Sequence, residues 1–248
     1  MTKKNNLVRI AATADIHVRE TENGKWTDYF KTLSKQADVL LICGDLTDTG
    51  RPEEARVLAE ELKACSIPVI GVLGNHDCES DMQDEVIRIL NNEQVHILDG
   101  DSVIVNDIGF AGTKGFGGGF GQHMLPMWGE QMNKDYIQVS VDEAMRLDRA
   151  LVRLESKSTG LKKIVLLHYS PIEETVKGEP EQIFPFLGSS HLAEPLEHRR
   201  VTVVFHGHAH LGSLEGSTSG GVPVYNVSQA LLLKEGYEHP FYLFETAP

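Results

Sequence analysis

Apolar runs separated by polar turns divide the first ninety residues into alternating strands and helices. Residues 7–14, 38–43 and 68–73 are predicted strands, and the second is almost wholly apolar, as a strand buried on both faces requires. Helices are predicted between and after them, because apolar residues there recur on one face. They span about 26–36, Pro52 to about Ala64, and about 81–90. This alternation predicts a parallel sheet with helical crossovers.

The pattern changes after about residue 95. Short predicted strands now lie close together, separated by turn residues, which indicates hairpins and a second, mixed or antiparallel sheet. A helix is predicted at about 140–157. The predicted strands after residue 95 are 95–98, 102–106, 108–112, 164–167, 201–205, 222–227 and 241–245. With no internal repeat and no linker between two complete halves, we expect one domain over residues 1–248. The expected fold is α/β, a four-layer α/β/β/α sandwich of two mixed β-sheets flanked by helices.

Two long segments fit neither a strand nor a helix. Residues 114–135 contain six glycines together with His123 and Trp128, and residues 170–190 are rich in proline and glutamate. Loops of this length inside a compact domain are usually functional or disordered. We therefore predict that both are active-site loops, with a flexible surface as the alternative. Lys114, His123 and Trp128 are candidates to reach a substrate from the first of them.

Composition narrows the range of partners. The chain has 248 residues and a formal net charge of −13, so it lacks the basic footprint of nonspecific nucleic-acid binding. Its three cysteines show no spacing that would indicate a disulfide framework. The start of the chain has no apolar run typical of a signal peptide, and no stretch is apolar enough to span a bilayer. A cytoplasmic location without membrane association is the default expectation.

Five polar motifs follow predicted strands, and their side chains are of kinds that bind metals. Because ligands of an open α/β sheet collect beyond the carboxyl ends of its strands, we expect these motifs to converge on one edge. Imidazole and carboxylate donors suit zinc, manganese, iron, cobalt or nickel better than calcium. In chain order the motifs are Asp15-Ile16-His17, Gly44-Asp45-Leu46-Thr47-Asp48, Gly74-Asn75-His76-Asp77, His168 and Gly207-His208-Ala209-His210.

This set of donors is large enough for two adjacent metal ions. Two ions need a shared carboxylate, and Asp45 is the natural bridge because it lies in the middle of the set. The bridging position would also hold a hydroxide, since metal binding lowers the pKa of water. Each motif alone has a structural explanation, such as a turn for Asp15 or a satisfied core histidine for His168. Their joint occurrence at strand ends is what favours a metal site.

The five motifs together resemble those of the calcineurin-like metallophosphoesterase superfamily, over positions 15–210. The resemblance implies a two-sheet sandwich with outer helices and two divalent or trivalent transition metal ions, such as manganese, iron, zinc or nickel. It also implies that His76 contacts the phosphoryl group and can protonate the leaving oxygen, and that Asp48 is the acid that orients His76. The metal ligands it implies are Asp15, His17 and His210 for one ion, Asn75, His168 and His208 for the other, and Asp45 as the bridge.

One departure from the superfamily's protein phosphatases bears on the substrate. Their second motif continues Asp-Arg-Gly, whereas this chain has Asp48-Thr49-Gly50 and so lacks the arginine that clamps phosphate. The pattern is closer to the phosphodiesterase and small-molecule phosphatase branches. We therefore expect metal-dependent hydrolysis of a phosphomonoester or phosphodiester in a small phosphorylated molecule. The alternatives are a non-catalytic metal-binding scaffold of the same fold, or a nuclease, against which the acidic charge argues. The oligomeric state cannot be read from the sequence.

Overall fold

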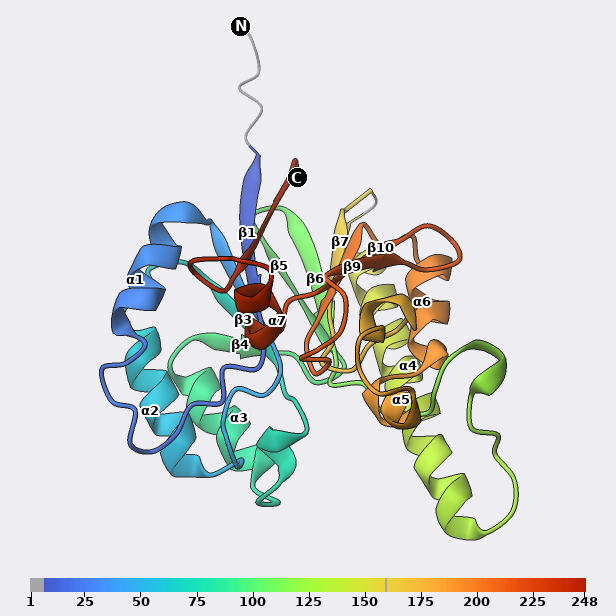
Figure 1. Ribbon diagram of the computed structural model, residues 1–248. Helices are drawn as coiled ribbons and strands as arrows, with labels where there is room; N and C mark the ends of the chain where they lie inside the picture. The colour runs from blue at the N-terminus through green and yellow to red at the C-terminus, as the bar shows by residue number, and fades with distance from the viewer. Residues whose placement is uncertain (1–6, 159) are drawn as a thin grey trace, which may run out of the picture.

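The computed structural model describes residues 7–158 and 160–248, and its centre is a pair of β-sheets packed face to face (Figure 1). The first sheet has the strand order β11-β1-β2-β3-β4. Strands β1 to β4 run parallel, and β11 closes the edge antiparallel to β1. These strands are β1 (Val8–Thr13), β2 (Val39–Cys43), β3 (Val69–Val72), β4 (Val95–Ile97) and β11 (Tyr242–Thr246).

The second sheet has the order β5-β6-β7-β8-β10-β9. Its four central strands are parallel, and an antiparallel strand lies at each edge. Both sheets are therefore mixed. The strands are β5 (Asp101–Val105), β6 (Ile108–Gly112), β7 (Lys163–Leu166), β8 (Val203–His206), β9 (Glu215–Ser217) and β10 (Pro223–Asn226).

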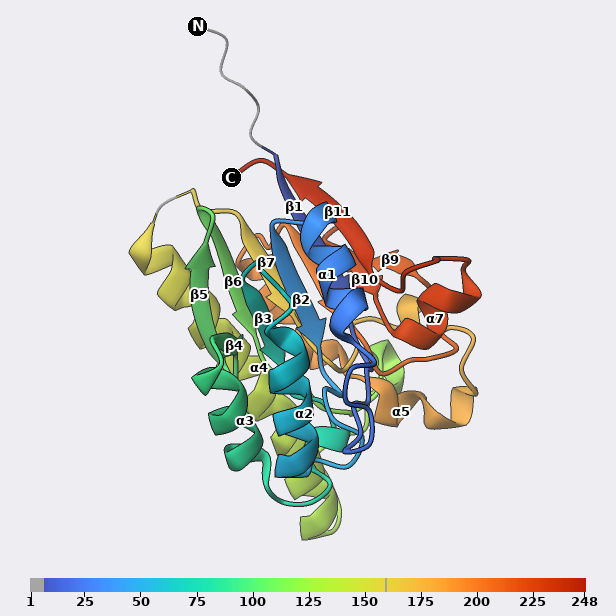
Figure 2. The same ribbon diagram turned by 90° about the vertical axis from the view of Figure 1, so that its left-hand side faces the viewer.

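Helices cover the outer face of each sheet. Figure 2 shows the first three helices side by side in front of the first sheet, while α4 and α6 lie on the far side of the second. Among the described residues, no helix is both long and apolar enough to cross a membrane. The helices are α1 (Thr27–Gln36), α2 (Pro52–Leu62), α3 (Gln83–Asn92), α4 (Gln131–Lys157), α5 (Phe184–Leu187), α6 (Ala193–His198) and α7 (Gln229–Lys234).

The core explains why the central strands are apolar on both faces. Side chains alternate along a strand, so β2 sends Leu40 and Ile42 toward the helices and Val39 and Leu41 toward the second sheet. A third apolar layer lies between the second sheet and α4, where Leu151 is fully buried. Burial on both faces therefore fixes the position of each central strand between its helices and the other sheet.

The predicted fold, a single domain with two mixed sheets flanked by helices, is confirmed, but several boundaries differ. The sequence pattern groups the strand at 95–98 with the later hairpins, whereas β4 pairs in parallel with β3 in the first sheet. Helix α4 begins at Gln131 rather than near residue 140, so the predicted loop 114–135 ends inside a helix. The other loop, 170–190, contains α5 and short 3-10 turns rather than irregular chain throughout. Elements this short bury too few residues to produce a readable hydrophobic period.

Candidate metal centre

The five motifs meet where the two sheets end together. Asp15 and Asp45 follow β1 and β2, and Asn75 follows β3, all in the first sheet, whereas His168 and His208 follow β7 and β8 in the second. Main-chain hydrogen bonds tie neighbouring motifs together, and the amides of Asp15 and His17 donate to the carbonyls of Gly44 and Asp45. Seven donor side chains remote in sequence are thus brought to one edge of the sandwich.

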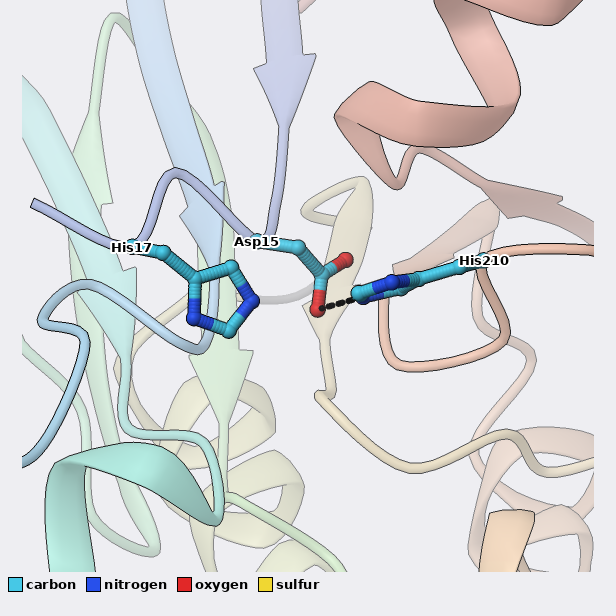
Figure 3. Close-up of side chains that lie close together, drawn as sticks. All are labelled: Asp15, His17 and His210. Atoms are coloured by element: carbon cyan, nitrogen blue, oxygen red, sulfur yellow. Dashed lines mark ion pairs between the residues drawn. The ribbon is translucent and has the colours of Figure 1, made fainter.

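The first donor cluster consists of Asp15, His17 and His210, whose ligand atoms all lie within 4.8 Å of one another (Figure 3). Nε2 of His210 is 3.3 Å from Oδ1 of Asp15. The ring of His17 lies on the other side of the same carboxylate in Figure 3. The amide of His208 donates to both oxygens of Asp15 at 3.1 Å. Asp15 therefore holds the last motif in place and keeps a carboxylate oxygen directed at two imidazoles.

The second cluster consists of Asp45, His168 and His208. Nε2 of His168 lies 2.9 Å from Oδ1 of Asn75 and 3.4 Å from Oδ1 of Asp45. The other oxygen of Asp45, Oδ2, lies 3.7 Å from Nε2 of His17. Asp45 thus directs one oxygen toward each cluster.

Main-chain carbonyls fix which nitrogen of two histidines faces the cluster. Nδ1 of His168 is 3.1 Å from the carbonyl of Cys43, and Nε2 of His208 is 3.1 Å from the carbonyl of Phe186 in α5. A neutral imidazole that donates one N–H to a carbonyl presents its other nitrogen as a lone-pair donor. His168 therefore presents Nε2, and His208 presents Nδ1. This arrangement suits metal coordination.

The backbone of the site is strained at its donors. Asp15, His17, Asp45 and His208 all have positive φ, between 44° and 70°. Residues other than glycine in this region cost on the order of 1–3 kcal/mol each and persist where the surrounding structure imposes them. Four of the seven predicted metal ligands share this conformation, which indicates that the fold stores strain to aim them.

The pKa values of the buried acids and histidines also favour a metal site. Burial, reinforced by the charges of Asp15 and Asp77, raises the pKa of Asp45 to about 9. Burial also pushes the pKa of Asp15 upward, but hydrogen bonding and charge interaction with His210 and His168 leave it below its ordinary value. Burial lowers the pKa of His168, so its ring is neutral at pH 7. Acids crowded in a buried site beside neutral imidazoles are stabilised by bound cations, so the donor set fits metal ions.

Comparison with known proteins identifies the group. The sequence model described as calcineurin-like phosphoesterase matches residues 8–212. The chain belongs to this family.

The curated relative that the chain matches has low sequence identity. A probable glycerophosphodiester phosphodiesterase, GpdQ, of Arcobacter nitrofigilis is 22% identical over 183 residues. That match covers 73% of this chain and 60% of GpdQ, so the chain spans only about three fifths of this curated relative.

Solved structures share the fold at low identity. The phosphopantetheinyl hydrolase PptH of Mycobacterium tuberculosis has a TM-score of 0.67 and 13% identity, with 95% of each chain covered. The protein TT1561 of Thermus thermophilus has a TM-score of 0.59 and 17% identity, with 97% of this chain and 99% of that chain covered. These similarities show that the chain shares the fold of both proteins.

The structure places the predicted pair of the phosphoesterase, His76 and Asp48, together, but not by the expected contact. Nδ1 of His76 lies 2.7 Å from the main-chain carbonyl of Asp48. The carboxylate of Asp48 instead accepts from Arg19, with Nε–Oδ2 at 3.0 Å, and lies 3.8 Å from Nδ1 of His17. Asp48 therefore contacts His76 through its main-chain carbonyl rather than its carboxylate, and its role in orienting His76 stays a prediction.

The sequence interpretation missed the role of Asp77, the last residue of the third motif. It is fully buried, and its carboxylate accepts from the amides of Leu46 at 3.1 Å, Thr47 at 2.8 Å and Gly74 at 2.8 Å, and from the Thr47 hydroxyl at 2.5 Å. Asp77 thus joins the loop that carries Asp45 to the loop that carries Asn75. The only signal in the sequence was its place beside the predicted ligands.

Two motif glycines leave room for donors from other strands. A Cβ built on Gly74 would collide with the carboxylate and amide of Asp45. One built on Gly207 would lie 2.6 Å from Oδ2 of Asp15 and 2.5 Å from Cβ of Ala14. Each glycine is therefore required by a neighbouring motif rather than by its own turn.

Parts of both predicted active-site loops contact the candidate ligands. The carbonyl of Lys114 accepts from the amides of His168 and Tyr169, and Phe186 holds His208 as described above. A pocket of about 400 Å³ is lined by residues of both segments, including His123. Trp128 is 68% exposed, and no ring contact involving it is found among the described residues. Both segments thus contact candidate ligands, Trp128 is exposed, and the role of the segments as active-site loops stays a prediction.

Proposed function

We propose that this phosphoesterase hydrolyses phosphomonoester or phosphodiester bonds of a small molecule, using a dinuclear metal centre. The observation that carries the proposal is the position of Asp45 between the two donor clusters, with Oδ2 facing His17 and Oδ1 facing His168. A carboxylate shared by two sets of nitrogen and oxygen donors is what a pair of neighbouring metal ions requires.

The residues would divide into two coordination sets. Asp15, His17 and His210 would hold one ion, Asn75, His168 and His208 the other, and Asp45 would bridge them. Nitrogen and oxygen donors in these numbers suit manganese, iron, zinc or nickel. When bound, two such ions neutralise charge on the phosphoryl group and lower the pKa of water enough to supply a nucleophile at neutral pH.

His76 would exchange a proton with the leaving group. Its contact with the carbonyl of Asp48 requires a proton on Nδ1, so Nε2 is the nitrogen free to act. A protonated ring would donate from Nε2 to the departing oxygen. The side chain is 38% exposed, so a substrate can reach it. The amide of His76 also donates to Oδ1 of Asp45 at 2.9 Å, which keeps this ring next to the proposed bridge.

The substrate class follows from three features. Thr49 replaces the phosphate-clamping arginine of the protein phosphatases, which favours a small molecule over a phosphoprotein. The formal net charge of −13 disfavours nucleic acid. The similarity to a probable glycerophosphodiester phosphodiesterase supports phosphodiesters as one class of substrate. The two loops beside the donors, 114–135 and 170–190, would form the walls that select the substrate.

The test is a panel of phosphomonoesters, cyclic nucleotides and other diesters, each assayed with manganese, iron, zinc and nickel. We expect turnover with at least one pair of substrate and metal. His76→Ala should keep its metal content but lose about 10²- to 10⁴-fold in turnover, the usual contribution of a positioned acid or base. His96→Ala is the matched control, because His96 is an exposed histidine on β4.

Two results would contradict the proposal in different ways. No hydrolysis by the metal-loaded wild-type protein across the whole panel would favour a binding scaffold. A His76→Ala variant as active as His96→Ala would leave the hydrolase standing and remove the role given to His76.

A further inference from the structure

Lys114 is a cation fixed beside the candidate metal centre. It follows β6 after a single residue, and its carbonyl accepts from the amides of His168 and Tyr169 at 3.0 and 3.1 Å. These two bonds join the main chain of Lys114 to the strand end that presents His168. The position of the lysine is thus set by the same hydrogen bonds that hold a predicted metal ligand.

The ammonium group is held by aromatic rings. Nζ lies 5.0 Å from the centroid of Phe116 and 5.1 Å from that of Tyr169, within the range of cation–π attraction. It also donates to the carbonyl of Gly115 at 3.2 Å. The ring of Tyr169 is buried and lies 4.5 Å from that of His208. Tyr169 therefore spans from the lysine to the second donor cluster.

The charge of Lys114 remains available to a ligand. Within the described part of the chain, no carboxylate oxygen lies within 4.0 Å of its Nζ. Arg19 differs, because its guanidinium is paired with the Asp48 carboxylate at 3.0 Å. Geometry places the lysine beside the site, because Tyr169 contacts both its ammonium group and the ring of His208. It is therefore a positive charge close to the donors and without a counter-ion.

We propose that Lys114 binds a non-bridging oxygen of the substrate's phosphoryl group and favours doubly charged phosphate groups over singly charged diesters. It would supply the positive charge that Thr49 leaves missing, from the second sheet rather than the first. A lysine binds phosphate as a point charge, so each added negative charge on the phosphoryl group strengthens the attraction. The inference rests on the function proposed above, because it assigns the substrate preference of the same site.

The experiment measures binding of inorganic phosphate to the manganese-loaded full chain by calorimetry, so that it does not depend on turnover. Lys114→Met keeps the length of the side chain and removes the charge. We expect it to weaken phosphate binding about tenfold or more, the usual effect of losing a hydrogen bond to a charged group. Lys114→Arg should retain most of the affinity. Lys35→Met, on an exposed lysine in the last turn of α1, makes the same change in net charge away from the site.

Activity and metal content complete the test. Lys114→Met should bind as much manganese as the wild type and should lose more kcat/KM with a monoester than with a diester. Its phosphate affinity should also depend less steeply on salt. Equal phosphate affinity of Lys114→Met and Lys35→Met, at equal metal content, would overturn the inference, as would a wild-type protein that does not bind phosphate. If Lys114→Met does not fold, Lys114→Gln takes its place with the same criterion.

The two proposals fail separately. A wild-type protein that binds phosphate through Lys114 but hydrolyses no ester would remove the proposed function and keep the phosphate site. If the wild-type protein hydrolyses esters and Lys114→Met leaves the phosphate affinity and kcat/KM unchanged, the proposed function stands and the role of Lys114 is removed.

Discussion

The buried carboxylate of Asp77 gives the sharpest prediction about how the site is held together. Each oxygen accepts two hydrogen bonds: Oδ1 from the amide and hydroxyl of Thr47, and Oδ2 from the amides of Leu46 and Gly74. Asp77→Asn preserves the shape but replaces one acceptor oxygen by an –NH2 group, which can only donate. At least one main-chain N–H is then left buried without a partner.

The size of the stability loss follows from the orientation of the asparagine side chain that leaves fewer donors without a partner. If its nitrogen faces Thr47, the hydroxyl can rotate to accept, and only the amide of Thr47 loses its partner. An orphaned buried donor costs about 1–3 kcal/mol, and the remaining bonds weaken because the acceptor is no longer charged. We expect a loss of about 2–4 kcal/mol in the free energy of unfolding. The loops that carry Asp45 and Asn75 should separate, so metal retention should fall as well.

Urea denaturation at pH 7, followed by far-UV circular dichroism and tyrosine or tryptophan fluorescence, measures the change. With a slope near 3 kcal/mol per molar, the midpoint should fall by about 1 M. Asp107→Asn is the control, because Asp107 is an exposed turn residue at φ 60°, a conformation that asparagine also tolerates. If the two variants unfold at the same urea concentration and retain equal metal, Asp77 does not hold these loops together.

Two further predictions test packing and pH dependence. Gly207→Ala should weaken metal retention at least tenfold, because the new Cβ would lie 2.6 Å from Oδ2 of Asp15, and about 1.4 kcal/mol of lost binding energy corresponds to a factor of ten. Metal analysis after dialysis against a chelator measures this change. Unchanged retention would mean that the loop moves to make room for the methyl group. Burial raises the pKa of Tyr29 above its ordinary value, so above about pH 10 the unfolded chain loses this proton before the folded chain does, and stability falls. Tyr29→Phe should lower the free energy of unfolding by about 1 kcal/mol at pH 7, because it removes the hydrogen bond to the carbonyl of Pro240. Between pH 7 and pH 11 the variant should lose less stability than the wild type, as measured by urea denaturation at each pH. An equal loss in the two proteins would show that the Tyr29 hydroxyl does not cause the pH dependence.

Much of the fold could be predicted because the central strands are buried on both faces. A run such as Val39–Cys43 can hardly be anything else in a chain of this size, and the helices between such runs force parallel pairing. Short elements escaped prediction. Helix α6 contains Pro195 and spans only six residues, and β9 spans three. Neither is long enough for a hydrophobic period to rise above chance.

The candidate donors were also readable from the sequence, because strand ends collect at one edge whatever the details of the loops. What the sequence could not provide was the atom that each residue uses. His76 contacts the main-chain carbonyl of Asp48, 28 residues away in the sequence, rather than its carboxylate. The nitrogen that His208 presents depends on a carbonyl 22 residues away in α5. Both are long-range effects of backbone direction.

The sequence by itself therefore determined the central apolar strands, the residue types at their ends and the family that this combination defines. The tertiary structure alone decided which oxygen of Asp45 faces which cluster, how Asp77 joins two motifs, and that Lys114 lies beside the donors with no carboxylate partner among the residues that the structure describes. The physical reason is that periodicity and residue type are local properties of the chain. Orientation and electrostatic environment arise only when segments remote in sequence pack together.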